Sequence, residues 1–256
     1  MEYGICNLSK IPLRSEPKHS GKLLSELLFG DHFKVEKKEG SWIKIENAYD
    51  NLTGWIEENQ CEPISGAYAI ELGNLPMVFS ADLVNFVEDA NAGLTPILLG
   101  SRLPGFHKTQ ILFKEEKYLF DGTVITGAQP KKNLVKLAYM FLNTPYLKGG
   151  NSVFGIDAPG FTQLVYKLNG YKLYRDVIQQ SKQGEVLSFI EESEPGDLAF
   201  FDDDEGNIIH TGIILANNHI VHAFGKVRID RLDQSGIFNN ELRRHTHKLR
   251  VIKKIF

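Results

Sequence analysis

The sequence feature that most constrains the fold is a glycine-rich loop leading into an amphipathic segment, within NTPYLKGGNSVFGIDAPGFTQLVYKLNG (residues 143–170). Apolar residues recur from Phe161 to Leu168 at spacings of three and four, which predicts a helix with one buried face. Gly170 stands where the C-terminal cap of that helix is expected. Such a loop commonly presents a nucleophile on the first helical turn, where unpaired amides and the helix dipole favour negative charge. At that turn this chain has Ala158, whose side chain has no nucleophilic atom.

The composition predicts a soluble globular protein with room for more than one hydrophobic core. The chain has 256 residues, of which 42% are hydrophobic and 24% charged. A net charge of -3 and the lack of any run near the ~20 apolar residues of a membrane span give no reason to expect nucleic acid or a membrane as partner. Cys6 and Cys61 are too few for a disulfide framework. The opening MEYGICNLSK has no basic region followed by an apolar run, so we expect a cytoplasmic protein unless a leader has been removed.

Residues 1–62 predict a small all-β barrel, because short β-rich runs alternate with turn residues. Within KVEKKEGSWIKIE, two strands are expected around Glu39-Gly40. We interpret Trp42 and Trp55 as core and corner residues of the barrel rather than as a ligand platform. The predicted strands cover residues 3–8, 23–28, 32–37, 42–45 and 54–57.

Residues 63–127 contain apolar runs broken by glycine and proline, with only weak helical periodicity. A second small barrel fits this pattern, although no repeat of the first is visible as sequence identity. The segment GAQPKKN (residues 127–133) is the expected boundary of the last domain.

Residues 128–256 predict an α+β domain. An apolar face recurs along residues 131–142, which predicts a first helix before the amphipathic segment described above. PGDLAFF (residues 195–201) predicts a turn and a buried strand, and IIHTGIILANNHIVHAF (residues 208–224) predicts two strands joined at residues 216–218. Helices packed on one antiparallel sheet make an α+β layout.

His210 and His222 lie on those last two strands, and the loop length decides their relation. A two-residue turn would send the two imidazoles to opposite faces of the sheet. A three-residue loop with Asn218 left-handed pairs Gly212 with His222 and makes His210 a diagonal neighbour on the same face. Without further evidence, two histidines on neighbouring strands can also be polar residues with no functional role. No cysteine or third histidine falls at a ligand spacing in the sequence, so we expect no metal and no other cofactor.

Several phrases together resemble a known family. TPYLKGG, FGIDAPGF, QLVYKLNG and YRDVIQQ are similar to the NlpC-type cysteine peptidases, which are papain-like and cut bacterial cell-wall peptides, as the γ-D-glutamyl-L-diamino acid endopeptidases do. IPLRSEP, LLFGDHFKV, WIKI and GWI resemble a bacterial SH3 domain. The resemblance implies a papain-like α+β domain at residues 128–256. It also implies one or two SH3-like barrels before it, at residues 1–62 and 63–127.

The resemblance also implies roles for individual residues in acyl transfer through a thioester. Position 158 is that of the nucleophile, His210 is the base, and His222 orients the base. The backbone amide at position 158 and the hydroxyl of Tyr146 hold the oxyanion.

Three further residues are implied to bind the substrate. Asp176, in the YRD phrase, binds the free amino end of a murein peptide that begins with L-alanine, since a carboxylate suits an ammonium group. Asp157 and Pro159 flank the nucleophile position and complete the substrate-binding set.

The chain departs from the family pattern at three positions. The family usually has tryptophan at Lys148, cysteine at Ala158 and serine at Pro159. Because loss of a triad nucleophile costs on the order of a millionfold in turnover in a well-studied protease, we predict that the chain is inactive as written. Neither Ser152 nor Thr162 occupies the nucleophile position. Pro159 further predicts that Ala158 is an N-cap and that the helix begins at the proline.

Three hypotheses follow from these departures. The first is a catalytically silent homologue that still binds murein peptides or regulates an active relative. The second is an active cysteine peptidase whose nucleophile was replaced by design, although three simultaneous departures favour a natural loss. The third is a scaffold whose barrels bind a protein partner while the peptidase-like fold is only structural.

Overall fold

A computed structural model describes residues 1–114 and 116–256. The chain forms two compact units. The first comprises Met1–Gly127 with Lys148–Val153, and the second comprises Ala128–Leu147 with Phe154–Phe256. The predicted domain boundaries at residues 62 and 127 stay predictions.

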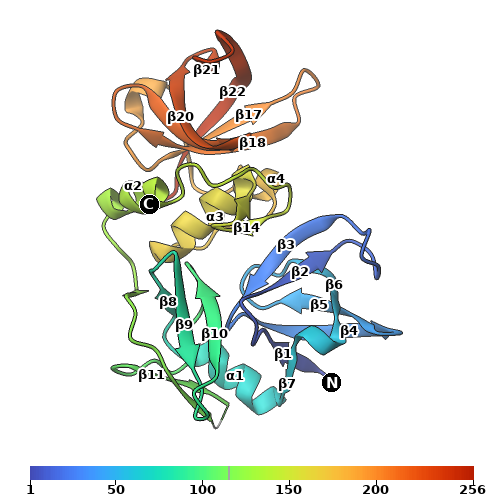
Figure 1. The fold of residues 1–256 in the computed structure, drawn as a ribbon. Helices are drawn as coiled ribbons and strands as arrows, with labels where there is room; N and C mark the ends of the chain where they lie inside the picture. Colours follow the sequence, from blue (N-terminus) through green and yellow to red (C-terminus); the bar gives the residue numbers. More distant parts are fainter. Residues whose placement is uncertain (115) are drawn as a thin grey trace. The chain divides into compact units, whose positions relative to one another are not determined.

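The N-terminal part of the first unit is a seven-stranded antiparallel sheet in the order β3-β2-β6-β5-β4-β1-β7 (Figure 1). The two strands predicted around Glu39-Gly40 are confirmed, since Glu39 pairs with Trp42 across the turn. Trp55 is buried as predicted, whereas Trp42 is only half-buried and contacts the His19 ring. The elements are β1 (Tyr3–Ile5), β2 (Lys10–Arg14), β3 (Leu23–Leu28), β4 (His32–Glu39), β5 (Trp42–Asn47), β6 (Thr53–Glu57), the 3-10 helix η1 (Glu58–Gln60) and β7 (Glu62–Ile64).

The rest of the first unit packs onto this sheet through a shared core. Ile5 and Phe29 of the N-terminal part belong to the same buried cluster as Leu72, Ile97 and other apolar residues of the following segment. That segment forms a four-stranded sheet in the order β10-β9-β12-β11 and a separate β8-β13 pair. Its elements are α1 (Gly66–Asn74), β8 (Val78–Ser80), β9 (Val84–Glu88), β10 (Leu94–Leu98), β11 (Gln110–Phe113), β12 (Glu116–Leu119) and β13 (Val124–Thr126).

A buried arginine also joins these two parts of the first unit. Nη1 of Arg102 lies 3.2 Å from Nδ1 of His32, and Nη2 donates to the Leu72 carbonyl. Arginine is always a donor, so His32 must accept with an unprotonated Nδ1. Burial, with the charge of Arg102 second, lowers the pKa of His32 to about 4, against an opposing effect of Asp31.

The first unit is therefore expected to lose stability in acid. The unfolded His32 side chain takes up a proton near pH ~6.5, whereas the folded one resists until pH about 4. The unfolded state thus binds more protons in this window, and the free energy of unfolding should fall as the pH drops through it, by about 2 kcal/mol after allowance for solvent screening. Both tryptophans lie in this unit, so urea unfolding followed by tryptophan fluorescence measures it. The His32→Gln variant should show a shallower decline. An equal decline would contradict the assignment.

The glycine-rich loop also contributes to the first unit. The Asn151 amide donates to the buried Glu26 carboxylate at 2.9 Å, and β14 (Asn151–Ser152) lies against β3. Gly149 has a φ of +81°, and a Cβ there would lie 2.1 Å from the Leu23 carbonyl oxygen. Only glycine fits this close approach.

The second unit contains a seven-stranded antiparallel sheet in the order β16-β22-β17-β18-β19-β20-β21 (Figure 1). Because β21 also pairs with β22, six of these strands form a closed ring. Helix α3 packs against β18 and β19, and α2 packs against α3 and β18. The elements are α2 (Lys131–Met140), β15 (Gly155–Ile156), α3 (Ala158–Leu168), α4 (Val177–Gln180), β16 (Glu185–Leu187), η2 (Ile190–Glu192), β17 (Leu198–Asp202), β18 (Ile208–Leu215), β19 (His219–Phe224), β20 (Lys226–Asp233), β21 (Gly236–Asn239) and β22 (Arg244–Lys254).

The predicted helices of this unit are present, with small changes at their ends. The first ends at Met140 rather than at residue 142, because the amides of Phe141 and Leu142 bond three residues back and tighten the last turn. The second ends as predicted, with Gly170 left-handed at φ +86°. Across the described residues, no helix has both the length and the apolarity that crossing a membrane requires.

Candidate functional site

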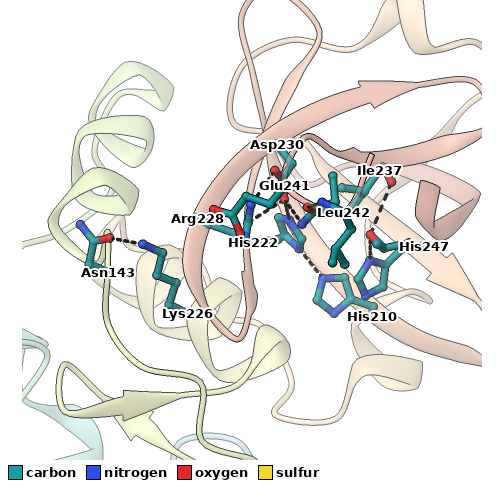
Figure 2. Close-up of polar contacts among 12 residues, drawn as sticks. Asn143, His210, His222, Lys226, Arg228, Asp230, Ile237, Glu241, Leu242 and His247 are labelled. Carbon is teal, nitrogen blue, oxygen red and sulfur yellow. Dashed lines mark hydrogen bonds and ion pairs between the residues drawn. The ribbon is translucent and has the colours of Figure 1, made fainter. Parts of the chain in front are cut away.

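His210 and His222 lie on one face of a hairpin with a three-residue loop, as the register argument predicts. Gly212 pairs with His222, Leu215 pairs with His219, and Asn217 and Asn218 both have left-handed φ angles of 58°. Nε2 of His210 lies 2.8 Å from Nδ1 of His222, with the ring planes nearly perpendicular (Figure 2). Both side chains are buried. The prediction that the pair points at Ala158 stays a prediction.

A buried carboxylate extends this pair on the far side of His222. Nε2 of His222 lies 3.1 Å from Oδ2 of Asp230, and Nε of Arg228 donates to the same oxygen at 2.8 Å (Figure 2). Arg228 also bonds Glu241 at 2.9 Å. His210, His222, Asp230, Arg228 and Glu241 therefore form one continuous polar chain.

Burial controls the charge states of this chain. It lowers the pKa of His210 well below its usual range, with His247 and His222 adding to the effect. It also lowers the pKa of His222, against the opposing hydrogen bond to Asp230. Burial by itself would raise the pKa of Asp230, but hydrogen bonds from His222 and Arg228 outweigh it, and the pKa is lowered. At neutral pH the imidazoles are therefore neutral and the carboxylate is ionised.

These charge states fix the tautomers. An ionised Asp230 only accepts, so Nε2 of His222 carries the proton that it donates. Nδ1 of the neutral His222 ring must then accept from Nε2–H of His210. Nδ1 of His210 is left with a free lone pair, which is the state required of a general base.

A third histidine completes the cluster. His247, on β22, stacks on His210 with ring centroids 4.0 Å apart, and its Nδ1 lies 2.9 Å from the Thr246 hydroxyl (Figure 2). Burial, with His222 second, lowers the pKa of His247 to about 4. No third histidine stands at a ligand spacing in the sequence, but the sheet brings His247 beside the pair from a strand that begins 20 residues after β19 ends.

Two functional candidates were thus missed, for different reasons. Asp230 could have been found from the next hairpin, since the register that turns at Gly225 places it opposite Ile220, diagonal to His222. His247 had no local signal, because β22 pairs with β17 and β21 rather than with β18 or β19.

Helix α3 begins one residue earlier than predicted. Asp157, not Ala158, is the N-cap: its side chain accepts the Gly160 amide at 2.8 Å, and the Phe161 amide bonds its carbonyl at 2.9 Å. Aspartate is a far better N-cap than alanine, and this preference outweighs the steric bias that a following proline imposes. Ala158 is the first helical residue and is 3% exposed.

The residues that flank Ala158 are held by further polar contacts. The Asp157 carboxylate also pairs with Arg175 at 2.9 Å, and both side chains are buried. Pro159 contributes its carbonyl oxygen, which accepts from Nε2 of Gln180 at 2.9 Å. The Thr162 hydroxyl is engaged by Gln180 Oε1 at 2.8 Å, so it offers no replacement nucleophile.

Tyr146 lies near the Asp157–Arg175 pair, and Asp176 lies further along the chain. Burial raises the pKa of Tyr146, the Asp157 charge raises it further and Arg175 opposes both, while the side chain stays 44% exposed. Asp176 is exposed and caps α4 by accepting the Gln179 amide at 2.9 Å. The structure therefore brings Tyr146 to the first turn of α3 and leaves Asp176 open to solvent. The substrate-binding roles of Asp157, Pro159 and Asp176 stay predictions.

Two family models match the chain. The NlpC/P60 family matches residues 143–246, and the bacterial dipeptidyl-peptidase SH3 domain matches residues 13–60. These matches confirm the resemblance predicted from sequence, together with the α+β fold class and its SH3-like region.

Individual proteins show the same similarity. The gamma-D-glutamyl-L-lysine dipeptidyl-peptidase of Bacillus subtilis (strain 168) is 27% identical over 78% of this chain and 71% of its own length. Dipeptidyl-peptidase 6 of Lysinibacillus sphaericus is 25% identical over 87% of this chain and 89% of its own. A crystal structure of an NlpC/P60 family protein from Bacillus cereus ATCC 10987 matches with a TM-score of 0.84 and 20% identity over 99% of both chains, so the fold is shared.

Proposed function

We propose that the C-terminal unit binds murein peptides with a free N-terminal L-alanine and does not cleave them. Residues 143–246 of the chain match the NlpC/P60 family. The single observation that carries this proposal is Ala158. It is the buried first residue of α3, where the family has its thiol, and a methyl group cannot attack a peptide carbonyl.

The surrounding groups support retained peptide binding. The His210–His222–Asp230 chain keeps the hydrogen bonds that would orient a base, although the chain has no thiol at position 158 for a base to activate. The names of the similar proteins supply the ligand class, since two of them are called gamma-D-glutamyl-L-lysine dipeptidyl-peptidases.

Asp176 is the proposed partner of the free amino group. One of its oxygens accepts the Gln179 amide, which fixes the carboxylate at the start of α4. The side chain is exposed, so it can form a charge-assisted hydrogen bond with an incoming ammonium group.

Calorimetry with L-Ala-γ-D-Glu-L-Lys and its diaminopimelate counterpart tests this proposal. We expect 1:1 binding of at least one of them and at least about tenfold weaker binding of the N-acetylated peptide, because acetylation removes the ammonium charge. Asp176→Asn should weaken binding of the free peptide by a similar factor. Asp204→Asn, at another exposed aspartate, should leave it unchanged.

The same samples test catalytic silence. Prolonged incubation in chelator should release no L-Ala-D-Glu, as judged by chromatography. Release that disappears in a His210→Ala variant would overturn the silent assignment. Failure to bind either peptide would favour the scaffold hypothesis, in which the SH3-like region binds a protein partner.

A further inference from the structure

The three histidines form a cluster that peptide binding does not explain. His210, His222 and His247 come from β18, β19 and β22, and one ring nitrogen from each lies within 4.8 Å of the other two. Figure 2 shows the three rings gathered on one face of the sheet. A base and its orienting group need two imidazoles, so the third requires a separate account.

The chemistry of the three donors selects a class of ligand. Imidazole nitrogens suit zinc and its neighbours among the first-row transition metals, whereas magnesium and calcium prefer oxygen ligands. We propose that His210, His222 and His247 together bind one divalent transition-metal ion, with zinc as the expected occupant. Three imidazoles leave the fourth position of a tetrahedral ion open to water or to an exogenous ligand.

The local geometry needs only a small adjustment to hold such an ion. Two nitrogens bound to tetrahedral zinc at about 2.0–2.1 Å lie roughly 3.3 Å from each other. The hydrogen-bonded nitrogens of His210 and His222 are 2.8 Å apart and would have to separate slightly. The ring nitrogens of the cluster that lie up to 4.8 Å apart would have to approach one another. The half-buried position of His247 gives the cluster an accessible side.

Asp230 supports the same assignment. Histidine ligands commonly donate their second ring N–H to a carboxylate, which fixes the tautomer and raises ligand basicity. Nε2 of His222 already has this partner at 3.1 Å, so Nδ1 is the nitrogen that binds the ion. Because Nδ1 also accepts from His210 in the metal-free protein, the ion replaces the hydrogen bond between the two rings.

Metal titration of the full, tag-free chain after chelator treatment tests the site. We expect calorimetry with zinc chloride to show one site, and cobalt(II) to give the visible absorption of a tetrahedral complex. His247→Gln should weaken zinc binding by more than about a hundredfold, since it removes a direct ligand. Asp230→Asn should weaken it by about 10–100-fold, as outer partners of metal ligands do. His245→Gln is the matched control on the same strand, because His245 is exposed and pairs with Asp233, and it should bind as the unaltered chain does.

Circular dichroism verifies that each variant is folded. If Asp230→Asn does not fold, the zinc affinity of His247→Gln tests the proposal. The proposal is overturned if the unaltered chain binds no zinc, if His247→Gln binds as tightly, or if His245→Gln loses binding equally. The outcome is independent of the peptide-binding proposal when the peptide calorimetry is also run in chelator, where the three histidines hold no metal ion. A negative result in one experiment therefore does not affect the other proposal.

Discussion

Replacing Ala158 by cysteine is expected to create a reactive thiol whose pKa lies below the reference value of about 8.5. The residue is the first of α3, so the helix dipole favours the thiolate there. Nδ1 of His210 has a free lone pair and can take the thiol proton if the pair faces position 158, as predicted. Iodoacetamide labelling followed against pH measures the thiol pKa, and Cys6 and Cys61 are first replaced by serine to remove background labelling.

Peptide cleavage by Ala158→Cys should be detectable but weak. Pro159 restricts the backbone of residue 158, and this backbone decides where the sulfur points. A misplacement of ~1 Å can cost about a hundredfold in rate. Ala158→Cys with Pro159→Ser restores the residue pair usual in the family and should therefore cleave up to about a hundredfold faster than the single variant.

Two outcomes would change this interpretation. Equal and high activity in both variants would show that Pro159 is neutral and that the chain lacks only a thiol. Normal labelling without cleavage by either variant would indicate that the peptide-binding surface itself has changed. His210→Ala in the double variant is the control, and it should abolish cleavage while leaving a thiol to label.

Replacing Arg175 by methionine is expected to destabilise the C-terminal unit by about 3–5 kcal/mol. Arg175 and Asp157 are 5% and 7% exposed, so the substitution leaves a carboxylate without its cation in a site that water hardly reaches. Asp157 is also the N-cap of α3, so the loss of stability should affect the helix that carries position 158. Hydrogen exchange of peptides from the second unit measures the local free energy of opening.

Trp42 and Trp55 both lie in the first unit, so tryptophan fluorescence gives a separate measurement of that unit. Arg231→Met, at an exposed arginine of β20, should alter stability by less than about 0.5 kcal/mol. Adding Asp157→Asn to Arg175→Met should recover part of the loss, since asparagine still caps the helix but carries no charge. If Arg175→Met lowers the free energy of opening by less than about 1 kcal/mol, the proposed contribution of the buried ion pair to stability is contradicted.

The sequence by itself determined the features that depend on neighbouring residues. The end of α3 follows from apolar spacing and a glycine that tolerates a left-handed φ. The contact between His210 and His222 follows from a loop of three residues, because strand pairing is a matter of counting once the loop length is known. The start of α3 lies one residue before the predicted position, because the capping strength of Asp157 outweighs the bias that Pro159 imposes on Ala158.

The tertiary structure decided everything that depends on distant segments. It brought His247 to the pair from β22, gave Asp157 a cation 18 residues away, and placed Lys148–Val153 in the first unit through Glu26. None of these contacts leaves a periodic or local signature. Each depends on the closure of a sheet or a loop, and many chain paths of similar local preference would bring different residues together.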